Sequence, residues 1–370
     1  IGGAISGSGT LTIAPKTAST TIGLAGATGD LNLDTTELNF LSDGFSSITF
    51  GSASATGKIT ASGYTYSDYL RLYNYGASSH GIEFIGAVNT GLNNLTLYTT
   101  GSVTQGTSGS ISAAGLELLG TGGSYVLTNI ANSITTLAGN TGTVSFLENS
   151  GFAIGSVNTV GLTTSGNTTL STTGTVTQTQ KLAVSGLELL GTGGTYTLTN
   201  TGAGNAVTTL AANTGVVSFT QSTAYTVGTV STIGITTTGN LALSGTAGFT
   251  ISKDITSGVG TQTYTGPITL STNQINLTST DALISFSGST TKINGAQALV
   301  INSGSGSISF GGLVGDSTPI SSLTLQGTGS NTLPGSIRAV GAIDLKGTSR
   351  TNTLVATTTL TSDSAGTITL

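Results

Sequence analysis

Residues 284–301 have the sequence ISFSGSTTKINGAQALVI, and residues 308–325 have the sequence ISFGGLVGDSTPISSLTL. The two segments align without a gap when Ile284 is set over Ile308. The alignment sets these apolar residues over one another: Phe286 and Phe310, Leu299 and Leu323, Ile301 and Leu325. A fixed period between 20 and 50 residues is typical of solenoids, in which each repeat is one turn of a coil. The alignment therefore predicts a β-solenoid with one turn in about 24 residues.

A longer period of 71–73 residues occupies the middle of the chain. TTLAGNTGTVSF at 135–146 returns as TTLAANTGVVSF at 208–219, and GLELLGTGGSYVLTN at 115–129 returns as GLELLGTGGTYTLTN at 186–200. The longer period is close to three times the 24-residue period, so it corresponds to a copied block of three turns. At this turn length the chain would form about 15 turns.

The composition indicates an all-β protein. Charged residues make up only 6% of the chain, glycine occurs 57 times, and cysteine and methionine are absent. Short runs rich in Val, Ile, Thr, Phe and Tyr alternate apolar with polar residues, and Gly, Asn and Ser interrupt them, which is typical of strands and corners. In one such run, GTVSF, Val144 and Phe146 would point inward and Thr143 and Ser145 outward. The net charge of −5 and the scattered cations exclude a nucleic-acid partner, and the apolar runs are too short to span a bilayer.

We expect one solenoid over residues 1–370 in three regions. Residues 1–85 would form divergent first turns that include a tyrosine-rich stretch at 63–80. Residues 86–250 would hold the three-turn blocks, and residues 251–370 the turns with the 24-residue period. The start IGGAISGSGT has no initiator methionine and no basic leader, which suggests a processed or excised beginning.

The repeats resemble those of filamentous-haemagglutinin-type exoproteins. The resemblance rests on GTQTYTGPITL, ISFSG…ALVIN and ISFGGLVGDSTPISSLTL, and it is clearest over residues 260–330. It implies a right-handed parallel β-helix belonging to a large adhesin, secreted to the surface of a Gram-negative bacterium.

The glutamates of the copied block are the first candidates for chemistry, because parallel β-helices also form polysaccharide lyases and hydrolases. Glu117 and Glu188 each lie between two leucines, so we expect leucine inside and glutamate on a solvated face. Three turns apart they would be about 14 Å from each other along the axis, whereas a glycosidase pair needs roughly 5–9.5 Å. We therefore expect no enzyme activity.

Other motifs indicate structure rather than catalysis. The GTGG motif lacks the lysine and the helix of a phosphate-binding loop and predicts a β-corner. GATGDLNLD resembles a single calcium-binding nonapeptide, with Asp30 and Asp34 as weak candidate ligands. His80 is the one histidine and has no partner motif. Threonine changes position between turns, which disfavours an ice-binding array. We expect no cofactor and no metal.

A stripe of tyrosine and arginine is the candidate contact surface. The stretch 63–80 holds five of the ten tyrosines. In a strand, Tyr69, Arg71, Tyr73 and Tyr75 would share one face, which suits recognition of another protein or, second, of a glycan. The alternative is that the N-terminal segment of the same chain covers this stripe.

Self-association is the leading functional hypothesis. Both ends of the chain have strand-like sequences without an evident cap, so we expect head-to-tail stacking into an extracellular fibre or sheath, with possible lateral bundling. The residues expected to form the stacking ends are Ile1, Ile5, Leu11, Ile13, Ile368 and Leu370. The second hypothesis is the shaft of a larger secreted adhesin, and the third is a polysaccharide-active enzyme.

Overall fold

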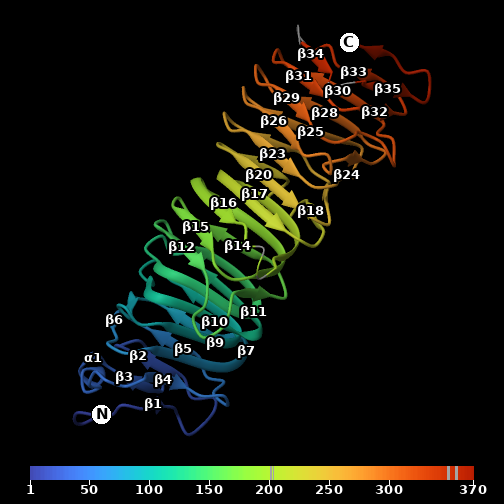
Figure 1. Cartoon of the computed structure of the whole chain (residues 1–370). Coiled ribbons are helices and arrows are strands. Elements are labelled where there is room, and N and C mark those ends of the chain that lie inside the picture. The colour runs from blue at the N-terminus through green and yellow to red at the C-terminus, as the bar shows by residue number, and fades with distance from the viewer. Residues whose placement is uncertain (201, 203, 348–350, 355–356) are drawn as a thin grey trace. The chain divides into compact units, whose positions relative to one another are not determined.

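The computed structural model describes residues 1–200, 202, 204–347, 351–354 and 357–370, without the side chains of residues 77–80. Its contacts divide the chain into two units, Ile1–Ser185 and Gly186–Leu370. Each unit is a coil of short parallel strands with almost no helix (Figure 1). Together the units contain about 14 turns of roughly 23 residues, which confirms the predicted β-solenoid and is close to its predicted turn length.

The first unit contains one helical turn, α1 (Thr35–Leu38), and these strands: β1 (Thr10–Ile13), β2 (Ile22–Leu24), β3 (Leu31–Leu33), β4 (Ser47–Gly51), β5 (Ile59–Ala61), β6 (Tyr64–Thr65), β7 (Leu70–Phe84), β8 (Val88–Asn89), β9 (Leu95–Gln105), β10 (Ile111–Leu127), β11 (Ser133–Leu147), β12 (Gly151–Ile154), β13 (Leu162–Thr164), β14 (Thr168–Ser171) and β15 (Thr175–Gln178). The division between the units falls within strand β16 (Leu182–Leu198).

The second unit contains these strands: β17 (Ala206–Gln221), β18 (Tyr225–Val227), β19 (Ile235–Thr237), β20 (Leu241–Gly245), β21 (Phe249–Ile251), β22 (Ile255–Ser257), β23 (Gln262–Thr265), β24 (Ile268–Leu270), β25 (Gln274–Ser279), β26 (Ile284–Ser287), β27 (Ile293–Asn294), β28 (Ala298–Asn302), β29 (Ile308–Phe310), β30 (Ser322–Gln326), β31 (Asn331–Leu333), β32 (Ser336–Ala339), β33 (Ile343–Asp344), β34 (Asn352–Leu354), β35 (Thr359–Ser362) and β36 (Ile368–Thr369).

The core of the second unit follows the predicted register. Strand β26 pairs in parallel with β29 and sets Phe286 beside Phe310, with ring centroids 5.0 Å apart and planes 8° from parallel. Strand β28 pairs with β30 and sets the remaining predicted pairs together: Leu299 with Leu323 and Ile301 with Leu325. All six side chains are buried, so the 24-residue alignment is confirmed residue by residue.

The core of the first unit is built from ladders of leucine. Leu70 of β7 pairs with Leu95 of β9, which pairs with Leu116 of β10. All three are buried, and each turn adds another apolar side chain at the strand spacing of about 4.8 Å. In β11, Val144 and Phe146 are buried while Thr143 is exposed, which confirms the predicted inward face.

The GTGG motif forms a corner within strand β10. Gly120 and Gly122 have φ angles of +116° and +78°, which residues with a Cβ rarely adopt. The parallel register with β11 shifts between Gly120 and Ser124, and the register with β9 shifts between Leu119 and Ser124. The buried Tyr125 hydroxyl donates to the carbonyl of Leu97 at 2.9 Å on the inner side. The predicted corner is therefore confirmed.

Buried asparagines complete the corners of the copied block. Asn132 donates its side-chain amide to the carbonyls of Leu127 and Leu147, both at 3.1 Å. Asn205, its equivalent in the next copy of the block, donates to the two equivalent carbonyls at 3.3 and 3.0 Å. Because an unpaired buried carbonyl is costly, these side chains stabilise corners that the strand ladders leave incomplete.

Candidate functional site: buried glutamates and an aromatic strip

Glu117 is the most extensively bonded acidic side chain in the described part of the first unit. Leu116 and Leu118 on either side of it are fully buried in the core, so Glu117 points away from the core as predicted. Its exposed fraction is nevertheless only 2%. Another segment of the chain therefore covers it from outside.

The carboxylate of Glu117 accepts four hydrogen bonds. One oxygen, Oε1, accepts from the backbone N–H and the Oγ1 hydroxyl of Thr159 at 2.6 and 2.8 Å. The other, Oε2, accepts from the Thr96 hydroxyl at 2.6 Å and from the Asn158 amide at 3.1 Å. Three of these four bonds come from one loop, residues 155–161, which belongs to a later turn of the coil than Glu117.

Loop 155–161 is a tight hairpin that lies over the turn. Its two ends are joined by a bond of 2.8 Å from the Gly161 N–H to the Gly155 carbonyl. At its tip the Val157 N–H donates to the Thr159 carbonyl at 3.1 Å. The Gly155 N–H anchors the loop to the Leu137 carbonyl of β11. The hairpin geometry directs the Thr159 N–H at the carboxylate beneath it.

The second unit repeats this arrangement in the next copy of the block. Loop 228–234 closes by a bond of 2.8 Å from the Gly234 N–H to the Gly228 carbonyl, and its Val230 N–H donates to the Thr232 carbonyl. The Thr232 N–H in turn donates to Oε1 of Glu188 at 2.5 Å. Glu188 is 3% exposed. The copied block thus preserves a buried glutamate together with the loop that covers it.

The prediction that Glu117 and Glu188 lie on a solvated face is wrong. The alternation of leucine and glutamate correctly predicts that the glutamate side chains point away from the core. The loop that covers them comes from a later turn, so the local sequence does not indicate it. Burial by itself opposes ionisation, yet the hydrogen bonds from Thr96, Asn158 and Thr159 outweigh it and lower the pKa of the Glu117 carboxyl below its usual value. Glu117 is therefore an ionised clamp for its loop.

Glu148 is a third buried carboxylate with a local structural role. It accepts hydrogen bonds from the N–H groups of Ser150 and Gly151 at 3.1 and 3.0 Å, and also from the Ser150 hydroxyl. Its equivalent in the next copy of the block is Gln221, whose side chain both accepts from and donates to the backbone of Val207. Each copy therefore uses a buried polar side chain to hold a turn.

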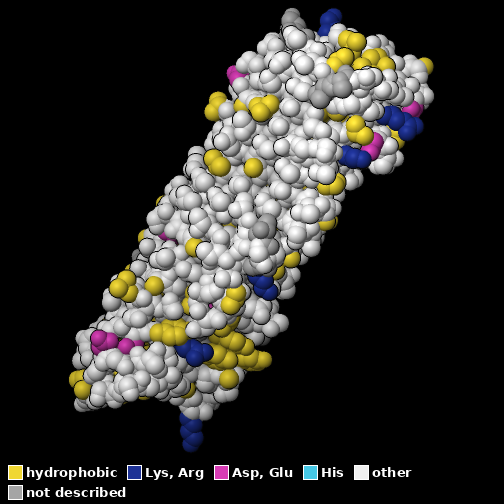
Figure 2. All heavy atoms as spheres, in the orientation of Figure 1, with side chains coloured by type: hydrophobic (Ala, Val, Ile, Leu, Met, Phe, Trp, Pro, Cys, Tyr) yellow, Lys and Arg dark blue, Asp and Glu magenta, His cyan; other side chains and the backbone are white. Residues whose placement is uncertain are grey.

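The predicted tyrosine and arginine stripe lies on the outer side of β7. Leu70 and Leu72 are buried, whereas Arg71 and Tyr73 are half-buried and Tyr75 is 51% exposed. Figure 2 shows hydrophobic side chains gathered beside a cation over the part of the first unit where Figure 1 places β7 and β9. The shared face predicted for Arg71, Tyr73 and Tyr75 agrees with this burial pattern.

Tyr98 of β9 belongs to the same surface, and sequence reasoning missed it. Strand register sets Tyr73 beside Tyr98, and their rings stack with centroids 4.2 Å apart and planes 11° from parallel. Tyr75 lies 6.2 Å from Tyr98 at 14°. Burial, and then the neighbouring Tyr73, raise the pKa of Tyr98. Tyr98 follows Tyr73 by about the length of one turn, so the repeat itself carried the signal.

Tyr69 belongs to the glutamate clamp rather than to the open stripe. It precedes β7, and its hydroxyl shares a hydrogen bond of 2.5 Å with the Thr96 hydroxyl and accepts one of 2.6 Å from the Asn158 amide. Loop 155–161, rather than the N-terminal segment, therefore contacts the Tyr69 end of the stripe.

The two candidate calcium ligands are engaged in local turns. Asp30 accepts from the Thr21 N–H and hydroxyl at 3.1 and 2.9 Å, and these bonds lower the pKa of Asp30. Asp34 caps helix α1 by accepting from the Glu37 N–H at 2.8 Å. Among the residues that the structure describes, no group of three acidic or histidine side chains could hold a metal ion. The side chain of His80 lies outside the described residues.

Threonines of the second unit stack more regularly than expected. Strand pairing sets Thr236, Thr256 and Thr278 on successive turns, so the expectation that threonine changes position between turns is wrong for this ladder. Asn213 precedes the ladder and Asn302 follows it. Such hydroxyl and amide ladders form the polar outer face of the coil.

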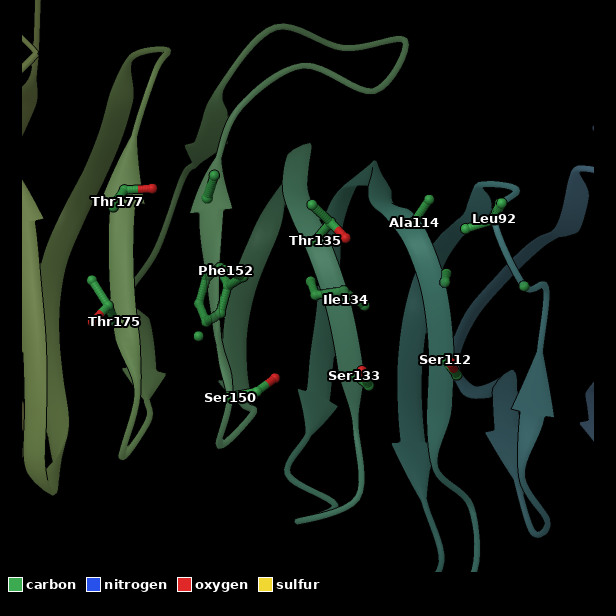
Figure 3. Close-up of a pocket in the computed structure, with 14 residues that line it drawn as sticks. Leu92, Ser112, Ala114, Ser133, Ile134, Thr135, Ser150, Phe152, Thr175 and Thr177 are labelled. Carbon is green, nitrogen blue, oxygen red and sulfur yellow. The ribbon is translucent and has the colours of Figure 1, made fainter.

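A shallow groove of about 570 Å³ crosses the first unit. Figure 3 shows the side chains that line it, from neighbouring strands β10, β11, β12 and β15 and from Leu92 and Ser150 outside them. Ser112 and Ser133 pair across two of these strands, and Phe152 lies in a third. None of the described lining residues is ionisable, so the groove offers shape and hydroxyl groups but no acid or base.

The residues predicted to form stacking ends lie in these places. Ile1 contacts Glu37 through its amino group, and Ile5 forms a parallel bridge with Leu41. Leu11 and Ile13 are half-buried in β1. At the other end, Ile368 and Leu370 are exposed.

Comparisons with protein-family models, with curated proteins and with solved structures give no match for this chain. Within the described residues, no helix has the length and apolar character needed to cross a membrane.

Proposed function

We propose that this chain is a structural β-solenoid that stacks end to end in an extracellular fibre or sheath. The observation that carries the proposal is the duplicated clamp: Glu117 and Glu188 each hold a loop at the same place in the copied block. A catalytic carboxylate must reach a substrate, whereas these two carboxylates accept hydrogen bonds from their own chain. Both copies of the block therefore keep a contact that stabilises the coil.

The edge of β1 supports stacking. Strand β1 pairs with β4 along one edge, where the Gly9 carbonyl accepts from the Ser46 N–H. Alternate residues of a strand direct their backbone groups to opposite edges, so Thr10 and Thr12 direct theirs away from β4. That second edge can accept a parallel strand of another copy, as the strand edges of a solenoid do between turns. The absence of cysteine and the resemblance to filamentous-haemagglutinin-type repeats support a place outside the cell.

A proline in β1 tests the stacking. Thr12→Pro removes one outward backbone donor and leaves the donors that face β4 in place, so it should shorten or abolish assemblies without lowering the unfolding temperature. Sedimentation velocity over a range of concentrations measures the effect. In β34 (Asn352–Leu354) the Asn331 N–H donates to the Thr351 carbonyl, so Leu354 directs its backbone groups away from β31, and Leu354→Pro provides the matched variant on a second strand. A chain that sediments as a monomer at every concentration contradicts self-stacking and favours the shaft of a larger adhesin.

A further inference from the structure

The outer strip formed by Arg71, Tyr73, Tyr75 and Tyr98 presents three nearly parallel rings beside a cation. We define these four residues as the aromatic strip. The rings of Tyr73 and Tyr75 lie within 14° of the plane of Tyr98. The ladder of β7 and β9 sets the spacing of the three residues, and the stacking of the rings sets their common angle, so the rings form a platform.

One face of the platform adjoins a position without a side chain. Tyr73 has Tyr98 as its neighbour on one side and Gly51 of β4 on the other. Tyr98 covers the first ring face at 4.2 Å. Since Gly51 has no side chain to stack on the second face, that face of Tyr73 is the place for a planar or chair-shaped ligand.

Arg71 supplies a cation that the described residues leave without an acidic partner. Its Nε is buried and has no hydrogen-bond acceptor in the described part of the chain. Its strand neighbours are Thr49 and Thr96. The nearest acid along this ladder is Glu117, next after Thr96, and its two oxygens are already bonded to loop 155–161, Thr96 and Asn158. The described salt bridges use other cations: the amino group of Ile1, Lys58, Lys292 and Arg338.

The chemistry of the strip selects one class of ligand. Guanidinium groups bind carboxylate or sulfate in a forked geometry, and tyrosine rings stack against the C–H face of a sugar. A protein interface needs about 800 Å² from each partner, which three rings do not supply, and an anionic membrane needs a cluster of cations rather than one. We propose that the aromatic strip binds an acidic carbohydrate, with a sugar ring on Tyr73 and its anionic group on Arg71.

Calorimetric titration with three oligosaccharides tests this site. The probes are a galacturonate oligosaccharide, its methyl ester, and a sulfated oligosaccharide of similar length. We expect the two anionic probes to bind and the ester to bind at least ~10-fold more weakly, because the ester removes the partner of Arg71. Equal binding of acid and ester, or no binding of any probe, overturns the proposal.

Matched variants test whether the oligosaccharides bind at the aromatic strip. Arg71→Gln should weaken the anionic probes by ~10-fold and leave the ester unchanged, and Arg71→Lys should recover only part of the loss because it lacks the fork. Tyr73→Ser should weaken all three probes. Arg338→Gln removes an arginine paired with Asp363 in the second unit and should change nothing. Unchanged binding in Arg71→Gln, with an unchanged unfolding temperature, refutes the site whether or not the chain forms fibres.

Discussion

Replacing Glu117 by glutamine tests whether the buried carboxylate holds its loop. The carboxylate accepts two hydrogen bonds on each oxygen. Glutamine keeps one acceptor oxygen, and its amide group then faces the Asn158 amide, another donor. The loop then loses the hydrogen bond from Asn158, which is worth about 2 kcal/mol because its acceptor is charged, so loop 155–161 should be less stable by about 2 kcal/mol. The opening equilibrium of the loop should then increase by ~30-fold.

Amide hydrogen exchange at Thr159 measures this directly, because its N–H donates to Glu117 Oε1. The second unit provides a control within the same molecule: the Thr232 N–H donates to Glu188 and should keep its protection in Glu117→Gln. In Glu188→Gln the Thr232 amide should lose protection and the Thr159 amide should keep it. Unchanged protection at Thr159, or an equal loss at both amides, would refute the assignment of the glutamates as separate clamps.

Acid, a bulkier residue beneath the loop, and alkali should each perturb a defined part of the coil. Because the pKa of Glu117 is lowered in the folded chain, the stabilisation by its carboxylate is complete above the usual carboxyl pKa and is lost as pH falls through the lowered value. The protection of the Thr159 amide, corrected for intrinsic exchange, should therefore decrease only in acid. Glu117→Gln should remove that dependence on pH. Gly115→Ala would place a Cβ 2.5 Å from Asn94 Oδ1 and 2.8 Å from Val157 Cγ2, so both side chains must move. The loop that carries Val157 should shift and Thr159 should exchange faster, whereas an unchanged rate would contradict the packing. Burial raises the pKa of Tyr264 well above its usual value, so the free energy of unfolding should fall as pH rises past the unfolded tyrosine pKa. Urea titrations should show a smaller fall in Tyr264→Phe, and an equal fall in both proteins would argue against this assignment.

The core of the solenoid could be predicted because each turn repeats the one before it. Phe286 and Phe310 occupy the same position in neighbouring turns, and a shift by one 24-residue period is enough to pair them. The corner at Gly120 could be predicted equally well, since glycine is the residue that adopts positive φ without strain. Both inferences depend only on neighbours along the chain or one turn away.

The glutamate clamp could not be predicted in this way. Glu117 has the local pattern of a surface residue, and the residue that buries it, Thr159, lies far along the chain in a later turn. Only the copied block links the loops to the glutamates: GSVNTVG at 155–161 returns 73 residues later as GTVSTIG at 228–234, and Glu117 returns 71 residues later as Glu188. This repetition does not say where a loop folds. The contact of Asn158 with Tyr69 was hidden for the same reason.

Electron microscopy and fibre diffraction of the assembled chain reveal whether copies stack end to end. We expect unbranched filaments of stacked copies, with a reflection along the filament axis at about 4.8 Å from strands that continue across each junction. Single, unassembled particles at every concentration, with no such reflection, would contradict it.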